Sequence, residues 1–78
     1  MQVTIYTASW CRKCRDLKSV YADCQEVFKG YHWKTVDVDD DPDAPARAVP
    51  SVLIERQGNR DIVLVGFAEI NESLELVL

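Results

Sequence analysis

The sequence predicts a single α/β domain, residues 1–78, built on a four-stranded mixed sheet. Residues 1–7 and 32–38 have the composition of strands, and residues 11–29 between them repeat their apolar side chains at helical spacing. A strand, a helix and a second strand in this order form a unit whose two strands run parallel. Two further strand-like runs are joined by a tight turn, which predicts an antiparallel hairpin.

The first strand and helix follow from local patterns. Residues 1–7 (MQVTIYT) are rich in β-branched and aromatic side chains and contain no turn residue. After them, apolar residues recur every three or four positions, at Leu17, Val20, Tyr21, Cys24, Val27 and Phe28. This spacing predicts an amphipathic helix over residues 11–29 with one buried stripe. Gly30 stands where helices commonly end, so we expect the helix to terminate there.

A second strand, residues 32–38 (HWKTVDV), follows the helix. The next segment, residues 41–48, contains Pro42 and Pro45, which are compatible only with the first turn of a helix. We therefore expect one or two helical turns here at most, a short or vestigial second helix.

The second half of the chain predicts a hairpin and a final helix. Residues 51–55 (SVLIE) and 61–65 (DIVLV) are the two strands, and Gly58 and Asn59 in the turn can take positive φ. Helical spacing then returns, with apolar residues at Ile70, Leu74, Val77 and Leu78. It predicts a C-terminal helix over about residues 70–78.

The two predicted helices should cover one face of the sheet, which leaves the other face to the short 41–48 segment. The hairpin strands carry apolar residues on both sides, and Trp33 lies on the side of the second strand opposite Val36. We therefore expect an exposed or thinly covered apolar patch of at least a few hundred Å² on that face, and a monomer or a weak dimer. The alternative is that the short segment and long side chains such as Arg47 and Arg56 lie over it.

Cys11 and Cys14 follow the first strand and open the first predicted helix. Two cysteines separated by two residues can close a small disulfide ring or share a metal ion, and the spacing alone does not decide between them. Ser9 is a suitable N-cap, which would place Cys11 at or near the first helical position. Free backbone N–H groups and the helix dipole at that position stabilise a thiolate.

The neighbouring charges act in the same direction. Arg12, Lys13 and Arg15 are cationic, so we expect the pKa of Cys11 to lie below the ~8.5 of a free cysteine. Cys14 lies three residues before Leu17, on the buried stripe. One thiol would then be exposed and acidic and the other recessed, which is the asymmetry of a dithiol exchange site.

A zinc site is the main alternative. Zinc takes four ligands, and besides the pair the chain offers only Cys24 and His32. Cys24 lies farther along the same helix than Cys14, roughly 15 Å away at about 1.5 Å per residue, and cannot join it. We expect Cys24 to be a small buried hydrophobe. The sequence favours redox chemistry over a metal or cluster site shared between two molecules, and no bound metal is expected.

Composition and charge exclude other classes. The chain is 47% hydrophobic and 28% charged, as in small globular domains, and its longest apolar run, residues 62–68, is far shorter than the ~20 residues that span a bilayer. No signal sequence opens the chain, and no membrane partner is expected. The net charge of −4 argues against nucleic acid. Three cysteines with a reactive pair fit a reducing cytosol, so we expect a cytoplasmic location.

Acidic residues follow the second strand, at Asp37, Asp39, Asp40, Asp41 and Asp43. Because the carboxyl ends of parallel strands meet at one edge of a sheet, this acidic segment should lie near the cationic Cys11 loop. It is either a solvated loop or a surface that selects partners, and the sequence leaves both open.

The order of these features resembles a glutaredoxin of the thioredoxin superfamily. The likeness runs over essentially the whole chain: strand, Cys-x-x-Cys, helix, strand, Val-Pro, hairpin, Gly and helix. It implies a minimal thioredoxin (glutaredoxin-like) fold. The Thr4-Ile5-Tyr6-Thr7 run and Gly66-Phe67 are most similar to the small redoxins that donate electrons to ribonucleotide reductase.

The resemblance implies a thiol-disulfide oxidoreductase that reduces protein disulfides, with ribonucleotide reductase as one possible substrate. Cys11 would be the attacking thiol and Cys14 the resolving one. Their redox-active disulfide would serve without a bound cofactor, and electrons would come ultimately from NADPH through a reductase. Val49–Pro50 would be a cis peptide beside the pair. The implied partner-binding residues are Trp10, Arg12, Lys13, Val49, Pro50, Gly66 and Phe67.

The departures from the pattern concern the electron source. Glutaredoxins that use glutathione usually carry Lys or Arg shortly before the first cysteine, Pro-Tyr between the cysteines and a double Gly before the last helix. The chain has Thr7-Ala8-Ser9, Arg12-Lys13 and Val65-Gly66 instead. A tryptophan directly before the first cysteine, here Trp10, resembles the pattern of thioredoxin. These differences favour thioredoxin reductase over glutathione. The alternative function is a thioredoxin-like binding module, or an iron–sulfur or metal-bridging glutaredoxin without reductase activity.

Overall fold

The computed structural model describes residues 2–40 and 48–77 and has the strands and both long helices in the predicted order. The elements are β1 (Gln2–Thr7), α1 (Arg12–Val27), β2 (His32–Asp37), the 3₁₀ turn η1 (Val38–Asp40), β3 (Ser51–Glu55), β4 (Ile62–Val65) and α2 (Phe67–Val77). The segment 41–47, predicted to hold a short helix, lies outside the described residues.

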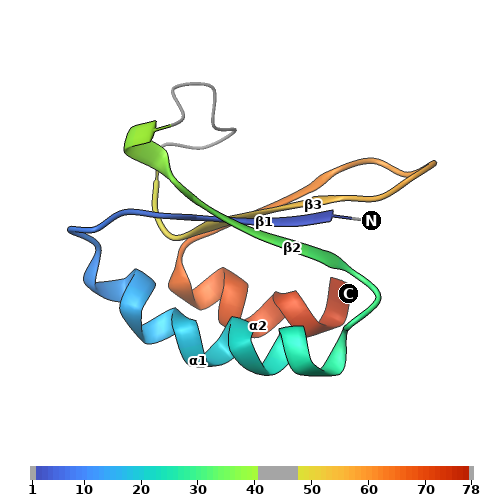
Figure 1. The fold of residues 1–78 in the computed structure, drawn as a ribbon, viewed down its shortest axis with the longest axis horizontal. Helices are drawn as coiled ribbons and strands as arrows, with labels where there is room; N and C mark the ends of the chain where they lie inside the picture. Colours follow the sequence, from blue (N-terminus) through green and yellow to red (C-terminus); the bar gives the residue numbers. More distant parts are fainter. Residues whose placement is uncertain (1, 41–47, 78) are drawn as a thin grey trace.

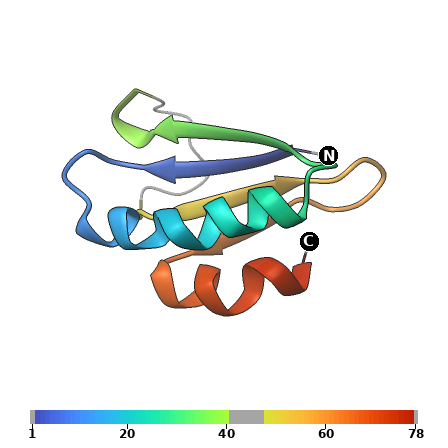
Figure 2. The ribbon, with the colours of Figure 1, turned by 60° about the horizontal axis from the view of Figure 1, so that its bottom comes forward.

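The sheet has the strand order β2-β1-β3-β4. Strands β1 and β2 are parallel, with Gln2 opposite His32 and Thr7 opposite Asp37, while β3 is antiparallel to both β1 and β4. Both helices lie on one face of the sheet (Figures 1 and 2). The predicted α/β class, the βαβ unit, the hairpin and the placement of the helices are confirmed.

The main core fills the space between the sheet and the helices. Its buried residues are Val3, Ile5, Leu17, Tyr21, Cys24, Val52, Ile54, Leu64, Ile70 and Leu74. The helical stripe predicted from spacing therefore supplies the α1 side of this core. Cys24 is 1% exposed, which confirms it as a buried small hydrophobe.

A second, smaller cluster contains the two cysteines. It consists of Tyr6, Ala8, Cys11, Cys14 and Val38, with Val36, Val49 and Leu53 packed against it. Because Val3 and Ile5 of β1 face the helices, strand alternation turns Tyr6 to the opposite face. The site loop is thus packed where the carboxyl ends of β1 and β2 meet.

Helix α2 begins at Phe67, three residues before the predicted start. Its first turn is held by the N–H of Ile70, which donates to the carbonyl of Gly66 (3.1 Å), and by the N–H of Val65, which donates to Glu69 Oε2 (2.6 Å). Gly66 has φ 93°, where a side chain would be strained. The predicted start lies three residues too far along because it was set at Ile70, the first residue of the apolar stripe, whereas Phe67 already begins the helix and packs against the main core.

The end of α1 also differs from the prediction. Phe28 is the C-cap, and its N–H donates to the carbonyl of Cys24 (2.8 Å). Gly30 is not among the glycines with positive φ, so its predicted role as the terminating residue is wrong. In the hairpin, Gly58 has φ 79° but Asn59 does not take positive φ.

Trp33 was predicted on the uncovered face, and this is wrong. Its side chain packs against the main core on the helix side, where the indole N–H donates to the carbonyl of Phe28 (3.2 Å). The alternation along β2 was right, since Val36 lies in the opposite, cysteine-containing cluster. The error lay in assigning the face, which depends on the loop that follows α1.

The exposed large apolar side chains on the other face lie, among the described residues, on the edge strand β4. Val63 and Val65 are exposed, Leu53 is half-buried, and Thr4 and Tyr6 are buried. A monomer or weak dimer therefore stays a prediction. Within residues 2–40 and 48–77, no helix is long and apolar enough to cross a membrane.

Candidate active site

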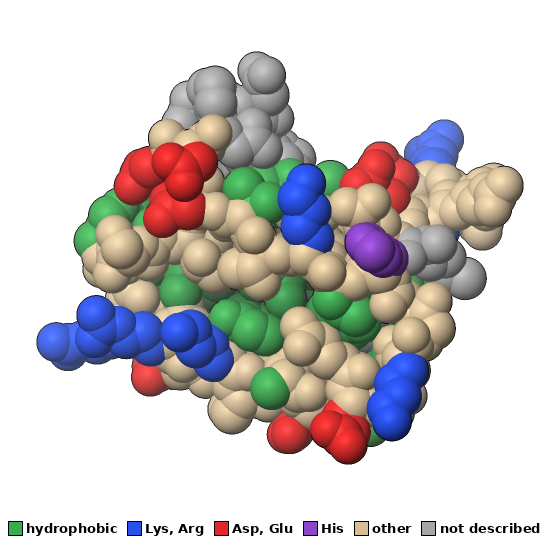
Figure 3. Space-filling view, viewed as in Figure 1, with side chains coloured by type: hydrophobic (Ala, Val, Ile, Leu, Met, Phe, Trp, Pro, Cys, Tyr) green, Lys and Arg blue, Asp and Glu red, His purple; other side chains and the backbone are tan. Residues whose placement is uncertain are grey.

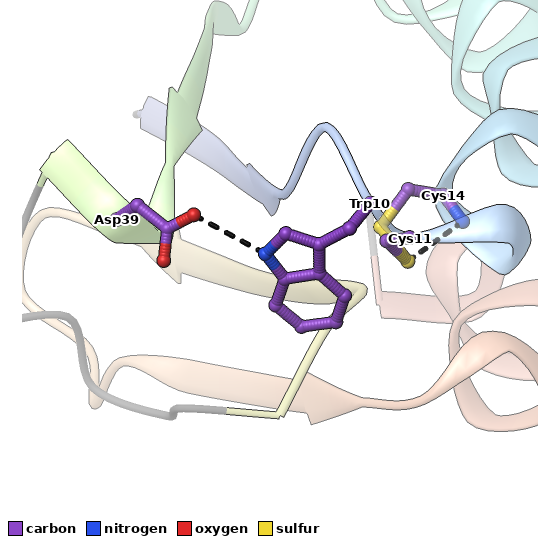
Figure 4. The surroundings of a disulfide bond; sticks show 4 residues. All are labelled: Trp10, Cys11, Cys14 and Asp39. Atoms are coloured by element: carbon purple, nitrogen blue, oxygen red, sulfur yellow. Dashed lines mark hydrogen bonds between the residues drawn. A yellow bond between two sulfur atoms is a disulfide. The ribbon is translucent and has the colours of Figure 1, made fainter.

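A disulfide joins Cys11 and Cys14 at the start of α1 (Figure 4), with their Cα atoms 5.3 Å apart. The N-cap of the helix is Cys11, not Ser9 as predicted. Cys11 takes this role because its own sulfur accepts the N–H of Cys14 (3.1 Å) while its backbone N–H donates to the carbonyl of Ala8 (3.1 Å). The sulfur therefore occupies the position where the free N–H groups of the helix converge.

The predicted difference in exposure between the two thiols is not found in the disulfide form. Cys11 is 6% exposed and Cys14 3%, because both pack against Tyr6, Ala8 and Val38. The difference between them lies in their positions instead. Cys11 caps the helix and receives an N–H hydrogen bond, whereas Cys14 is inside the first turn.

We expect this position to make Cys11 the more acidic thiol in the reduced protein. The rate of its alkylation by iodoacetamide should reach half its maximum below pH 8.5, since the helix N-terminus stabilises the thiolate. Mass spectrometry of the Cys11 peptide would follow the reaction. Cys24 is an internal control, because burial and, to a lesser extent, Glu75 and Asp23 raise the pKa of its thiol. A half-maximum for Cys11 at pH 8.5 or above would contradict the argument.

Trp10 connects the cysteine loop to the acidic segment after β2. Its side chain is 67% exposed, and its indole N–H donates to Asp39 Oδ2 (3.2 Å; Figure 4). The N–H of Asp39 donates in turn to Asp37 Oδ1 (2.9 Å). The prediction that the acidic end of β2 meets the Cys11 loop is confirmed. Asp41 and Asp43 lie outside the described residues.

The Val49–Pro50 peptide is cis, as the resemblance implied. Val49 is half-buried and packs against the cysteine-containing cluster. The side chain of Pro50 is fully buried, so its predicted place on the exposed binding surface is corrected. The carbonyl of Pro50 accepts the N–H of Gly66 (2.8 Å) and so ties this loop to the start of α2.

On the α2 side, a cation lies over an aromatic ring. The Nζ of Lys13 is 5.2 Å from the centroid of the Phe67 ring, within the range of a cation–π contact. This contact brings a residue from between the cysteines against the first residue of α2. Arg12, the other residue between the cysteines, is exposed.

The structure therefore gathers most of the predicted site residues around the disulfide. Sequence reasoning missed Asp39 as a partner of Trp10 and Tyr6 as a neighbour of the cysteines. Strand alternation could have found Tyr6, whereas no sequence signal pairs an indole with one particular aspartate. Within the described part of the chain, no three His, Cys, Asp or Glu side chains are grouped so that they could hold a metal ion.

Comparison with known proteins is consistent with this geometry. The family model for thioredoxin matches residues 1–77. The chain belongs to the thioredoxin family. It is 33% identical over 75 residues to thioredoxin H5 of Arabidopsis thaliana, covering 88% of this chain and 64% of that one. It is 30% identical over 81 residues to the thioredoxin of Listeria monocytogenes, covering 96% of this chain and 78% of that one.

Solved thioredoxins share the fold. Mitochondrial thioredoxin 3 of Saccharomyces cerevisiae superposes with a TM-score of 0.84 at 20% identity, covering 97% of this chain and 74% of that one. The chain spans 38%, 64% and 50% of the lengths of three curated thioredoxins that it matches.

Proposed function

We propose that this thioredoxin-family protein is a thiol-disulfide oxidoreductase that reduces disulfides in other proteins. The observation that carries the proposal is the Cys11–Cys14 disulfide at the N-terminus of α1, with the Cys11 sulfur hydrogen-bonded to the N–H of Cys14. A helix N-terminus stabilises a thiolate, and the thiolate is the nucleophile in disulfide exchange.

The reaction has two exchange steps. In the reduced protein the Cys11 thiolate attacks one sulfur of a substrate disulfide, which releases the other substrate sulfur as a thiolate and leaves a mixed disulfide. Cys14 loses its proton and attacks Cys11 Sγ, which releases the second substrate sulfur and closes the Cys11–Cys14 bond. Two electrons pass from the protein dithiol to the substrate, and the two substrate thiolates take up protons.

The surfaces around the disulfide fit a protein substrate. Trp10 is largely exposed on one side, and Phe67 with Lys13 lies on the other. Val49 packs against the cluster that contains the two cysteines, and we expect its backbone to pair with an extended partner segment. Ribonucleotide reductase is one candidate substrate, on the strength of the Thr4-Ile5-Tyr6-Thr7 and Gly66-Phe67 resemblance.

The electron source can be tested directly. We expect thioredoxin reductase, supplied with NADPH, to re-reduce the Cys11–Cys14 disulfide, and glutathione with its reductase to do so poorly. The reason is that Thr7-Ala8-Ser9, Arg12-Lys13 and Val65-Gly66 replace the residues of a typical glutathione site. The measurement is NADPH consumption in parallel assays with insulin as the disulfide substrate. Faster turnover with glutathione would overturn this assignment but not the proposed reaction.

A further inference from the structure

The two sides of the disulfide carry opposite charge. Arg12, Lys13 and Arg15 are exposed on the first turn of α1, and Asp39 and Asp40 are exposed on η1. Figure 3 shows basic side chains gathered over the first half of α1 and acidic side chains over η1, with the loop between them largely uncharged. The cysteine loop therefore lies between a positive and a negative edge.

One charge on each edge is held in position by an aromatic ring. Lys13 Nζ lies 5.2 Å from the centroid of Phe67, and Asp39 Oδ2 accepts the indole N–H of Trp10 (3.2 Å). Both rings belong to the surface beside the disulfide. Because these contacts restrict the Lys13 and Asp39 side chains, the ammonium and carboxylate groups are held at defined positions relative to a bound segment.

We propose that the site selects its substrates by this pair of edges. The preferred partner is a disulfide whose attacked cysteine lies in an extended segment with an acidic residue on one side and a basic residue on the other. Its acidic residue faces Lys13 and Arg12 at the start of α1, and its basic residue faces Asp39 and Asp40 on η1. The inference rests on the proposed function and names the substrate class for that reaction.

The direction of the bound segment comes from the backbone pairing with Val49 proposed above, because the substrate cysteine must also reach Cys11. One order of the two charges along the segment then places both against opposite charges. The reverse order places both against like charges. Like charges placed together suppress the wrong arrangement, so the pair of edges discriminates where a single charged patch would only attract.

Two peptides of equal composition test the proposal. One has the sequence Glu-Gly-Cys-Gly-Lys and the other Lys-Gly-Cys-Gly-Glu, both with blocked ends and with the cysteine as a mixed disulfide with 2-mercaptoethanol. The second-order rate constant for reaction with the reduced protein is measured by stopped-flow tryptophan fluorescence. We expect one order to react about three- to tenfold faster at low ionic strength, as for a few partly exposed charge pairs.

Salt and charge reversal show whether the preference is electrostatic and where it comes from. The ratio should approach one at ~1 M salt, where the Debye length is about 3 Å. The double variant Lys13→Glu with Asp40→Lys keeps the net charge and should reverse or abolish the preference. The matched control is Lys29→Glu with Asp61→Lys. Lys29 follows α1 and Asp61 precedes β4, and both are exposed. The preference for one peptide order should persist in this control variant.

A third peptide, Gln-Gly-Cys-Gly-Gln, separates the two proposals. Its reduction reports the exchange reaction without charge recognition. If it is reduced and the two charged orders react at equal rates, the charge selection is wrong and the oxidoreductase stands. If the reduced protein reacts with none of the three peptides, the proposed function itself is wrong, and the inference with it.

Discussion

Replacing Cys11 by Ser is expected to lower the rate of disulfide reduction by at least about a thousandfold, to the background set by the reductant alone. A serine hydroxyl stays protonated and cannot form a disulfide, so neither exchange step can take place. Replacing Cys14 by Ser has a different result. The Cys11 thiolate still attacks, but the mixed disulfide has no second thiol to resolve it and should accumulate.

Insulin reduction by dithiothreitol, followed by turbidity, measures the loss of rate in both variants. Intact-mass spectrometry of Cys14→Ser after incubation with an excess of oxidised substrate should show the protein plus one substrate half. Cys24→Ala is the matched control, because this thiol is buried in the main core and should not take part. Full activity of Cys11→Ser, or trapping by that variant instead of by Cys14→Ser, would reverse or remove the assigned roles.

The fold could be predicted because its signals are local. The β-branched and aromatic composition of β1, the apolar stripe at Leu17, Tyr21 and Cys24, and the glycine-containing turn each depend on neighbouring residues. The errors arose where tertiary contacts decide. Trp33 takes the helix side because its indole bonds to the loop after α1, and no pattern within β2 indicates that contact.

In the site, too, features that depend on local sequence were predicted and most of the side-chain contacts were not. The sequence predicted the cysteines and their place at the helix start, because motif and helical pattern adjoin in the chain. It did not predict that the Cys11 sulfur caps the helix or that Lys13 lies over Phe67. The contact of Lys13 with Phe67 joins two segments whose spacing depends on how α1 and α2 pack against the sheet. The Cys11 cap is local, three residues from Cys14, but the sequence offered Ser9 as a second candidate for the same role. The sequence left open whether the acidic segment selects partners, and the contacts of Lys13 with Phe67 and of Asp39 with Trp10, on which the proposed charge selection depends, are seen only in the structure.

Leu17→Ala is expected to have the largest effect on stability. The Leu17 side chain is fully buried in the main core, one turn beyond Cys14 on α1. Removing it leaves a cavity and should lower the free energy of unfolding by about 3 kcal/mol, within a usual range of roughly 2–5. A domain of this size has a free energy of unfolding of only about 4–12 kcal/mol in total.

Urea unfolding of the oxidised protein, followed by circular dichroism, measures the change. Val27→Ala is the control on the same helix, since Val27 is 69% exposed and its truncation should change stability by under about 0.5 kcal/mol.

The rate at which Cys24 is alkylated measures the same loss of stability without denaturant, because the buried thiol reacts only when the domain opens. In the oxidised protein Cys24 is the free cysteine. It is 1% exposed in the main core, and this burial is the main cause of its raised pKa. A loss of about 3 kcal/mol raises the population of open molecules on the order of a hundredfold, since each 1.4 kcal/mol is about a factor of ten. The alkylation rate of Cys24 in Leu17→Ala should rise by a similar factor when opening is fast, and in Val27→Ala it should stay near the native rate. Equal alkylation of the two variants would mean that the stripe on α1 does not hold the cysteine-bearing helix against the sheet.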